Sequence, residues 1–379
     1  MALKRCVTCL YPVSRPDAHF NSDGVCSACL SYGQRQNINW DDRLLKLRQW
    51  LEKARKHGGP YDCVVPVSGG KDSTYQVLKL QELGARVLCV HAGTDYQSDI
   101  GRRNLDNLKR FADLIEVTPN IEVRKKLVRI GLRLIGDLSY PEHLAIWSIP
   151  TRVAHQMNIP LVVWGEQPQR EYATPEGVAP SEVLDADWVA QFGGMLGLRL
   201  DDLVGMDGLT EQDFAIYRFP PESKAIGIWL GDYVNWDGWK NFFIAQQNGF
   251  EALPLPVEGS AANFENLDNY VTVLRDYLRY LKYGYNRATD IVCNQIRRGR
   301  ITRDEGLKII EQRETKPMTS LGKPVGEILD YFGISVEEWN AECDKWTNKD
   351  IHKNKWQYFN PDTYAGGVTF FADEYKEPK

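Results

Sequence analysis

The sequence has no long apolar run and no excess of positive charge. No stretch approaches the roughly 20 consecutive apolar residues that a membrane helix needs, and residues 1–6 lead into no apolar signal region. We therefore expect a cytoplasmic protein with no membrane partner. The formal net charge of −5 gives no overall attraction for polyanions, so we also expect no nucleic-acid partner.

A glycine-rich stretch, Ser68-Gly69-Gly70-Lys71-Asp72-Ser73, lies between an apolar run and an amphipathic run. Residues 62–67 read as a short buried strand, and residues 74–83 have apolar side chains at helical spacing. Paired glycines permit a tight turn, and the backbone amides of a helix N-terminus attract anions. Lys71 adds a full positive charge. The stretch therefore predicts a phosphate site; the alternative is an ordinary turn in which Asp72 caps the helix.

Strands and helices alternate through the rest of the first half. We expect further strands at residues 85–91, 114–117 and 159–165, and helices at 41–56, 104–111, 123–136 and 147–157. This alternation predicts a parallel sheet covered on both faces, with ligands at the carboxyl ends of its strands. The stretches 68–73, 91–96 and 165–167 follow strand ends, so we expect them to converge.

Four of the eight cysteines form two C-x₂-C pairs near the start of the chain. Cys6 and Cys9 are separated from Cys26 and Cys29 by 16 residues rich in turn formers. This spacing is typical of a four-cysteine zinc site, and a structural zinc ion would order a segment with too little apolar content to fold alone. Two disulfides or an iron–sulfur cluster are the alternatives. Cys63 and Cys89 alternate with apolar residues, so we expect them to fill the core.

The second half of the chain is less regular and then mainly helical. An aromatic cluster at residues 228–239 either fills the core or lines a pocket for a sugar or base. The spacing Thr302-Arg303-Asp304-Glu305 is a capping box, which predicts a helix over 303–313. We expect three parts in all: a zinc-binding module at 1–40, a nucleotide-binding domain at 41–240 and a helical region at 241–379.

The string SGGKDS is not the G-x-x-x-x-G-K-S/T pattern of the Walker loop; it resembles the PP-loop of the ATP pyrophosphatases. With the cysteine pairs and the stretches 164–168, 280–290 and 296–303, nearly the whole chain resembles the N-acetyl sugar amidotransferases of bacterial surface-polysaccharide and flagellar-sugar pathways. The resemblance implies an α/β fold with a Rossmann-like PP-loop parallel sheet (adenine nucleotide alpha hydrolase-like), an N-terminal four-cysteine zinc module and a helical C-terminal region.

The same resemblance implies a reaction. Such an enzyme uses ATP to adenylate the acetamido oxygen of a nucleotide-linked N-acetyl sugar, as in lipopolysaccharide O-antigen biosynthesis, and ammonia then displaces AMP to leave an acetamidino group. Mg²⁺ would accompany ATP, and Asp72 is the candidate to bind it. Lys71 would hold the phosphates, and Glu166 could orient ammonia or the amide. The expected ATP-binding residues are Val67, Ser68, Gly69, Gly70, Lys71, Asp72, Ser73, His91 and Gly165.

Four residues are candidates to bind the sugar substrate. Arg287, Arg297 and Arg303 would contact its diphosphate, unless they are solvated charges on helix faces. Glu171 lies in a loop where the family usually has Glu-Tyr-Gly-Gly, whereas here Glu171-Tyr172 is followed by Ala173-Thr174. We therefore expect the substrate contacts of that loop to differ.

None of the eight cysteines lies in a setting known for glutaminases, which use an N-terminal cysteine or one in a glycine-flanked turn. A separate glutaminase subunit is therefore expected to supply ammonia, with a possible ammonia-channel subunit. The main alternative function is a PP-loop enzyme that modifies tRNA by thiolation or lysidine formation. It predicts a basic surface and an exposed cysteine near the loop. A further alternative is a zinc-stapled scaffold that binds a nucleotide without catalysis.

Overall fold

The computed structural model describes residues 3–16, 18–172 and 180–352. Contacts between residues group the chain into two compact units. Unit 1 comprises Met1–Ile38, Pro168–Pro180 and Ala252–Lys379, and unit 2 comprises Asn39–Gln167 and Ser181–Glu251. Each unit is thus built from segments far apart in the sequence. The three-part division expected from the sequence remains a prediction.

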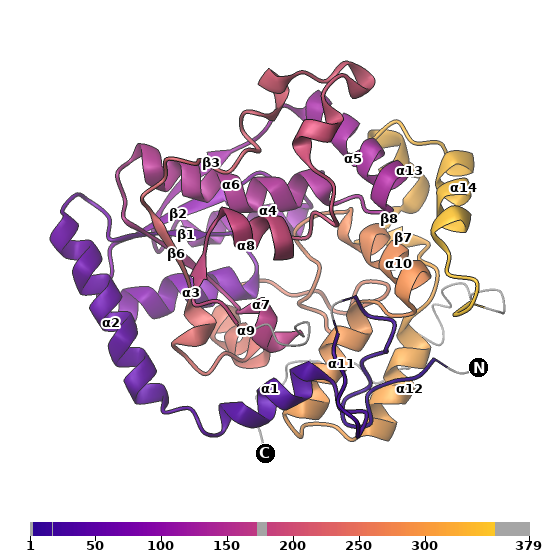
Figure 1. Ribbon diagram of the computed structural model, residues 1–379, viewed down its shortest axis with the longest axis horizontal. Coiled ribbons are helices and arrows are strands. Elements are labelled where there is room, and N and C mark those ends of the chain that lie inside the picture. The colour runs from indigo at the N-terminus through magenta and orange to yellow at the C-terminus, as the bar shows by residue number, and fades with distance from the viewer. Residues whose placement is uncertain (1–2, 17, 173–179, 353–379) are drawn as a thin grey trace. The chain divides into compact units, whose positions relative to one another are not determined.

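Unit 2 contains a six-stranded sheet in the order β3-β2-β1-β4-β6-β5. Strands β1, β2, β3 and β6 of this sheet are labelled in Figure 1. All neighbouring pairs are parallel except β5–β6. The chain order reverses between β1 and β4, which is where ligands bind in open α/β sheets. The predicted α/β fold with a mainly parallel sheet is therefore confirmed. The strands are β1 (Cys63–Pro66), β2 (Val87–Ala92), β3 (Asp113–Val117), β4 (Leu161–Trp164), β5 (Val183–Leu184) and β6 (Ile226–Trp229).

Alternation along the strands divides the core into two layers. Val64, Leu88 and Val162 pack in the cluster that includes the α5 and α6 side chains. Their neighbours Val65 and Cys89 pack in the other cluster, with α2, α3 and α4. Both faces of the sheet are therefore apolar and covered, as a parallel sheet requires. The helices are α2 (Trp40–His57), α3 (Lys71–Glu82), α4 (Asp99–Leu108), α5 (Ile121–Ile135), α6 (Tyr140–Gln156), α8 (Ala186–Phe192), α9 (Gly238–Gln247), and the short 3₁₀ helices η1 (Leu200–Leu203), η2 (Met206–Gly208), η3 (Glu211–Phe214) and η4 (Leu230–Asp232).

Unit 1 is mainly helical, with one small antiparallel pair of strands. The predicted capping box is confirmed: the Thr302 hydroxyl accepts from the Glu305 amide, and the Glu305 carboxylate accepts from the Thr302 amide. The described part of the chain contains no helix that is both long and apolar enough to cross a membrane. The elements are α1 (Ser27–Arg35), α7 (Pro168–Glu171), α10 (Thr272–Tyr283), α11 (Arg287–Arg297), α12 (Arg303–Arg313), β7 (Thr319–Ser320), β8 (Lys323–Pro324), α13 (Val325–Tyr331) and α14 (Val336–Trp346).

The structure differs from the sequence-based expectations at several elements. Helix α6 begins seven residues earlier than predicted, because Pro141 occupies its first turn, where proline is tolerated. Strand β6 was read only as part of the aromatic cluster. That cluster belongs to the core, since Trp229, Tyr233 and Trp236 are each only 2% exposed. Cys63 and Cys89 are fully buried, as expected for core residues.

Candidate functional site

The predicted phosphate loop connects β1 to α3 at the point where the strand order reverses. Gly69 has a φ of +86°, and a Cβ there would lie 2.6 Å from the Leu105 nitrogen of α4. Gly70 is the N-cap residue of α3 and provides no side-chain cap. The alternative that Asp72 is a plain N-cap is therefore wrong, because Asp72 lies in the first turn of the helix. A glycine at the cap leaves room for an anion at the helix N-terminus.

Hydroxyl groups hold the loop closed. The Ser68 amide donates to Ser73 Oγ at 3.3 Å, and Ser73 Oγ donates to the Gly70 carbonyl at 3.3 Å. The Gly70 amide donates to Ser68 Oγ at 3.3 Å. These bonds link the two ends of the loop, so the backbone is shaped by its own side chains. Val67 continues β1 by donating its amide to the Val90 carbonyl.

Lys71 and Asp72 form the charged part of the loop. Lys71 Nζ donates to Asp72 Oδ2 at 2.8 Å, and the lysine side chain is only 8% exposed. The Asp72 side chain is 35% exposed. Its other oxygen, Oδ1, accepts from Asn241 Nδ2 of α9 at 2.8 Å. A cation and a carboxylate thus lie together at the start of α3, as the binding of a phosphate and its counterion requires.

The ends of β2 and β4 flank the end of β1, from which the loop starts, because both strands pair with β1 in parallel. His91 Nδ1 lies 2.8 Å from the Val67 carbonyl oxygen, and the ring is 3% exposed. Burial lowers the pKa of His91, so this side chain links β2 to the start of the loop as a neutral ring. A Cβ on Gly165 would lie 2.5 Å from Nε2 of Gln76 in α3. The predicted convergence at the carboxyl edge of the sheet is therefore present, with half-buried Glu166 next to Gly165.

The four cysteines of the C-x₂-C pairs come together in unit 1. Their sulfur atoms all lie within 4.8 Å of one another, with Sγ atoms 3.6 Å apart for Cys9–Cys26 and 3.9 Å for Cys6–Cys29. Four sulfurs at about 2.3 Å from one tetrahedral ion would be about 3.8 Å apart, whereas a disulfide would bring two to about 2.05 Å. The cluster therefore fits one metal ion.

The C-terminal helices of unit 1 contact this cluster directly. Cys293 of α11 donates its thiol to the Cys9 carbonyl at 3.0 Å, and Arg297 Nη1 donates to Cys9 Sγ at 3.6 Å. Arg303 Nη2 donates to the Cys6 carbonyl at 3.4 Å. Two of the three arginines predicted to bind the sugar diphosphate therefore also hold the cysteine-bearing segment.

Glu171 lies in a buried ion triad. Its carboxylate is within 2.5 Å of Arg35 Nη1 from α1 and 3.3 Å of Arg298 Nη2, and Arg297 donates to its carbonyl at 2.9 Å. Burial alone would raise the pKa of Glu171, but Arg35, Arg298 and Arg297 hold it below its usual value. The side chain expected to bind substrate is thus paired with two arginines, and a third arginine is bonded to the backbone carbonyl of the same residue. Ala173 and Thr174, where the chain departs from the family pattern, lie outside the described residues.

Arg287 belongs to a second ionic network of unit 1. Its Nε lies 3.3 Å from Asp276 Oδ2, and its side chain is 18% exposed. Arg279 Nη2 lies 2.8 Å from Asp290, and Arg15 Nη1 3.1 Å from the same carboxylate. The alternative that Arg287 is a solvated charge on a helix face is therefore wrong.

Sequence reasoning missed Asn241, Arg35 and Arg298 at these sites. No local pattern marks Asn241, which lies 169 positions after Asp72. Arg298 lies in the stretch 296–303, which carries part of the family resemblance, but it was not predicted as a site residue. Its importance follows from its ion pair with buried Glu171.

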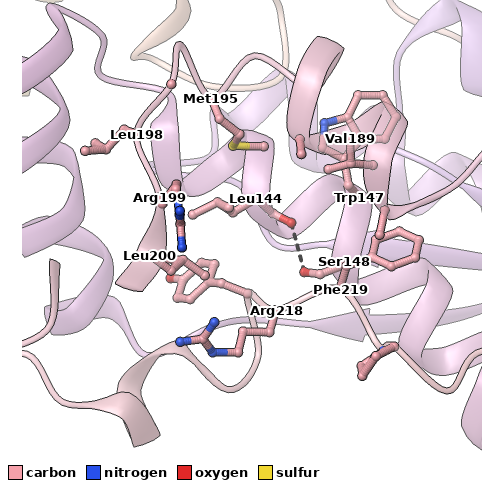
Figure 2. A pocket seen from close by; sticks show the side chains of 15 residues that line it. Leu144, Trp147, Ser148, Val189, Met195, Leu198, Arg199, Leu200, Arg218 and Phe219 are labelled. Carbon is pink, nitrogen blue, oxygen red and sulfur yellow. Dashed lines mark hydrogen bonds between the residues drawn. The ribbon is translucent and has the colours of Figure 1, made fainter. Parts of the chain in front are cut away.

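Unit 2 also contains an apolar cavity of about 600 Å³ that none of the predicted site residues lines (Figure 2). Trp147, Met195 and Phe219 form much of its wall, and Arg199 and Arg218 lie along one side. Ser148, a polar residue of the wall, is bonded to the carbonyl groups of Leu144 and Ile216. None of the residues that line the cavity belongs to the SGGKDS loop or to the stretches 91–96 and 165–167.

Residues 258–361 match the family model described as the C-terminal domain of LPS biosynthesis protein WbpG-like. This range contains Arg287, Arg297 and Arg303. No curated protein matches the chain. Similar solved structures include NMN synthetase from Francisella tularensis, with 15% identity, a TM-score of 0.27 and coverage of 58% of this chain and 99% of that one. The U34-tRNA thiolase NcsA from Methanococcus maripaludis, solved with its 4Fe-4S cluster, has 12% identity, a TM-score of 0.31 and coverage of 79% and 88%. This match, over about a quarter of the chain, is to a family of LPS biosynthesis, which agrees with the surface-polysaccharide family that the sequence resembles.

Proposed function

We propose that this protein is a cytoplasmic ATP-dependent amidotransferase, a C–N ligase that acts on a nucleotide-linked N-acetyl sugar. The observation that carries the proposal is the SGGKDS loop at the point where the strand order reverses, in a chain whose C-terminal domain is WbpG-like. The loop fits the phosphates of ATP, and the domain fits a role in the synthesis of a surface sugar.

The chemistry requires two bond exchanges. The acetamido oxygen attacks the α-phosphorus of ATP, and the bond to pyrophosphate breaks. Ammonia then attacks the former carbonyl carbon through its lone pair, AMP leaves with the amide oxygen, and the loss of a proton gives the acetamidino group. An amide oxygen is a poor leaving group. Transfer of the AMP group to this oxygen in the first step turns it into a good leaving group, which makes the second step feasible.

The residues of unit 2 have distinct roles in this scheme. Lys71, the Gly69 and Gly70 amides and the loop hydroxyls hold the phosphates that leave as pyrophosphate. Asp72 would bind Mg²⁺, which neutralises phosphate charge when bound. His91 and Gly165 shape the edge of the nucleotide site, and Glu166 orients the amide or ammonia.

Arg287 and Arg303 are our candidates for the sugar diphosphate in unit 1. Arg297 and Glu171 remain candidates for the same substrate; like Arg287 and Arg303, they also make internal contacts. The cysteine cluster would hold a structural Zn²⁺, since four thiolates leave no position open for a substrate. A separate glutaminase, with a possible channel subunit, would deliver the ammonia.

Oxygen labelling tests the proposed reaction. The full chain is incubated with ATP, Mg²⁺, ammonium chloride and UDP-N-acetylglucosamine or related nucleotide sugars that carry ¹⁸O in the acetamido group. We expect ¹⁸O in the AMP that forms and an acetamidino product. AMP that forms without the label would overturn adenylation of the acetamido oxygen. ATP–pyrophosphate exchange that depends on tRNA instead of a sugar would support the tRNA-modifying alternative.

A further inference from the structure

Both carboxylate oxygens of Asp72 are engaged, each by a different element. Asn241 Nδ2 of α9 donates to Oδ1 at 2.8 Å, and Lys71 Nζ donates to Oδ2 at 2.8 Å. The two donors differ in character. Asn241 carries a short neutral amide, whereas Lys71 has a long flexible stem and a charge that phosphate oxygens attract.

Asn241 is held firmly by its helix. The residue is only 1% exposed. Its backbone N–H donates to the backbone carbonyl of Asp237, the N-cap residue of α9. Helix α9 packs along α3, and a Cβ on Gly238 would lie 3.6 Å from Lys71 Cε. The first turn of α9 therefore forms a wall beside the lysine and aspartate of the loop.

We propose that Asn241 is a positioning residue, which keeps the Asp72 carboxylate aimed at Mg²⁺–ATP when Lys71 turns from Asp72 to the phosphates. The inference rests on the proposed use of ATP by the loop. Without Asn241, the half-buried Asp72 side chain would lose its second partner once Lys71 leaves, and each binding event would have to restrict its rotation. Restriction of one such side chain corresponds to roughly a three- to tenfold change in affinity.

Asn241→Leu is the informative variant, because leucine has a similar shape but no donor and no charge. Lys240→Ala is the matched control, since Lys240 lies on the exposed side of the same helix. ATP binding to the full chain is measured by calorimetry without Mg²⁺ and over a Mg²⁺ titration. We expect Asn241→Leu to raise the half-saturating Mg²⁺ concentration roughly three- to tenfold and to leave Mg²⁺-free ATP binding within twofold of wild type. Lys240→Ala should change neither.

A double-mutant cycle with Asp72→Ala completes the test. In that background the leucine substitution should have no further effect on the Mg²⁺ dependence, because the positioned carboxylate is gone. An unchanged Mg²⁺ requirement in Asn241→Leu, or an equal loss of ATP binding with and without Mg²⁺, would overturn the inference. If the leucine variant does not fold, the same measurements are made on Asn241→Ser. A wild-type chain that binds Mg²⁺–ATP but never adenylates a sugar would overturn the proposed reaction and leave this result standing.

Discussion

Gly69 and Gly70 are neighbours in the loop, but the structure constrains them differently. A Cβ on Gly69 would lie 2.6 Å from a backbone nitrogen, at a φ of +86°. Gly70 has a φ of −68°, and the nearest atom to its Cβ would be Ser68 Oγ at 3.3 Å. We expect Gly69→Ala to lose on the order of 1–3 kcal/mol of folding stability and most ATP affinity, and Gly70→Ala to lose less than about 1 kcal/mol. Denaturant melts measure the stability of the two variants, and ATP titrations measure their affinity. Equal losses in Gly69→Ala and Gly70→Ala would show that the two glycines are not constrained differently.

Asp276 provides a prediction about pH. Burial would raise its pKa, but Arg287 and Arg279 hold the pKa of Asp276 down at about 2. Because the folded pKa is lower than the unfolded one, near 3.9, ionised Asp276 stabilises unit 1 above about pH 4. That contribution, on the order of 2 kcal/mol, is lost as the pH falls from about 4 to 2.

The test compares Asp276→Asn with Asp330→Asn, a substitution at an exposed position of the same unit. Denaturant stability is measured from pH 6 to pH 2. Asp276→Asn should be less stable than wild type at pH 6, and the difference should shrink towards pH 2, whereas Asp330→Asn should follow wild type throughout. A constant difference over this pH range would show that the charge of Asp276 is not the cause.

At the scale of elements, the Glu171 triad joins α1, α7 and the end of α11. Removal of one partner from a buried ion pair costs about 3–5 kcal/mol, because the remaining charge is uncompensated. We therefore expect Glu171→Gln to destabilise the chain by that amount. Glu327→Gln is the control, since Glu327 is 63% exposed, pairs with Lys323 at 3.8 Å and should contribute less than about 1 kcal/mol. Similar unfolding midpoints for the two variants would exclude a structural role for the triad.

The elements that the sequence predicted are those with a strong local pattern. Apolar runs indicated β1, β2, β3 and β4, and a proline at the end of β1 was compatible with that strand because Pro66 is its last residue. Strand β6 was missed because its last two residues, Ile228 and Trp229, were assigned to the aromatic cluster and its first two form no strand pattern of their own. Helix α1 was missed because it starts inside the second cysteine pair, where metal ligation was expected to dictate the structure.

The candidate sites were predictable from the sequence only where their residues lie within one short segment. The SGGKDS loop and the C-x₂-C pairs each encode their chemistry within a few residues. The contact between Asn241 and Asp72, or between Arg297 and Glu171, joins positions more than 100 residues apart. Such pairs are brought together by tertiary packing, so they cannot be predicted from periodicity or spacing in the sequence.

At the scale of the whole molecule, the cysteine cluster should stabilise unit 1 and leave unit 2 largely unaffected. Its bonds to Cys293, Arg297 and Arg303 lie within unit 1, whereas the SGGKDS loop lies in unit 2. Metal ligation contributes on the order of 10 kcal/mol to small zinc modules, so the metal should hold the second half of α11 and the start of α12 in place.

We expect the purified full chain to carry about one zinc ion and to lose it on treatment with a strong chelator. Hydrogen exchange should then rise in peptides from α1, α11 and α12, because their amides lose the support of the cluster, and remain unchanged in peptides from β1 and α3. Cys343→Ser is the matched control, since Cys343 is buried but lies outside the cluster, and its zinc content should equal that of wild type. Exchange that rises equally in both units would contradict a local role for the metal, and a chain that binds no metal would remove the basis for a zinc site.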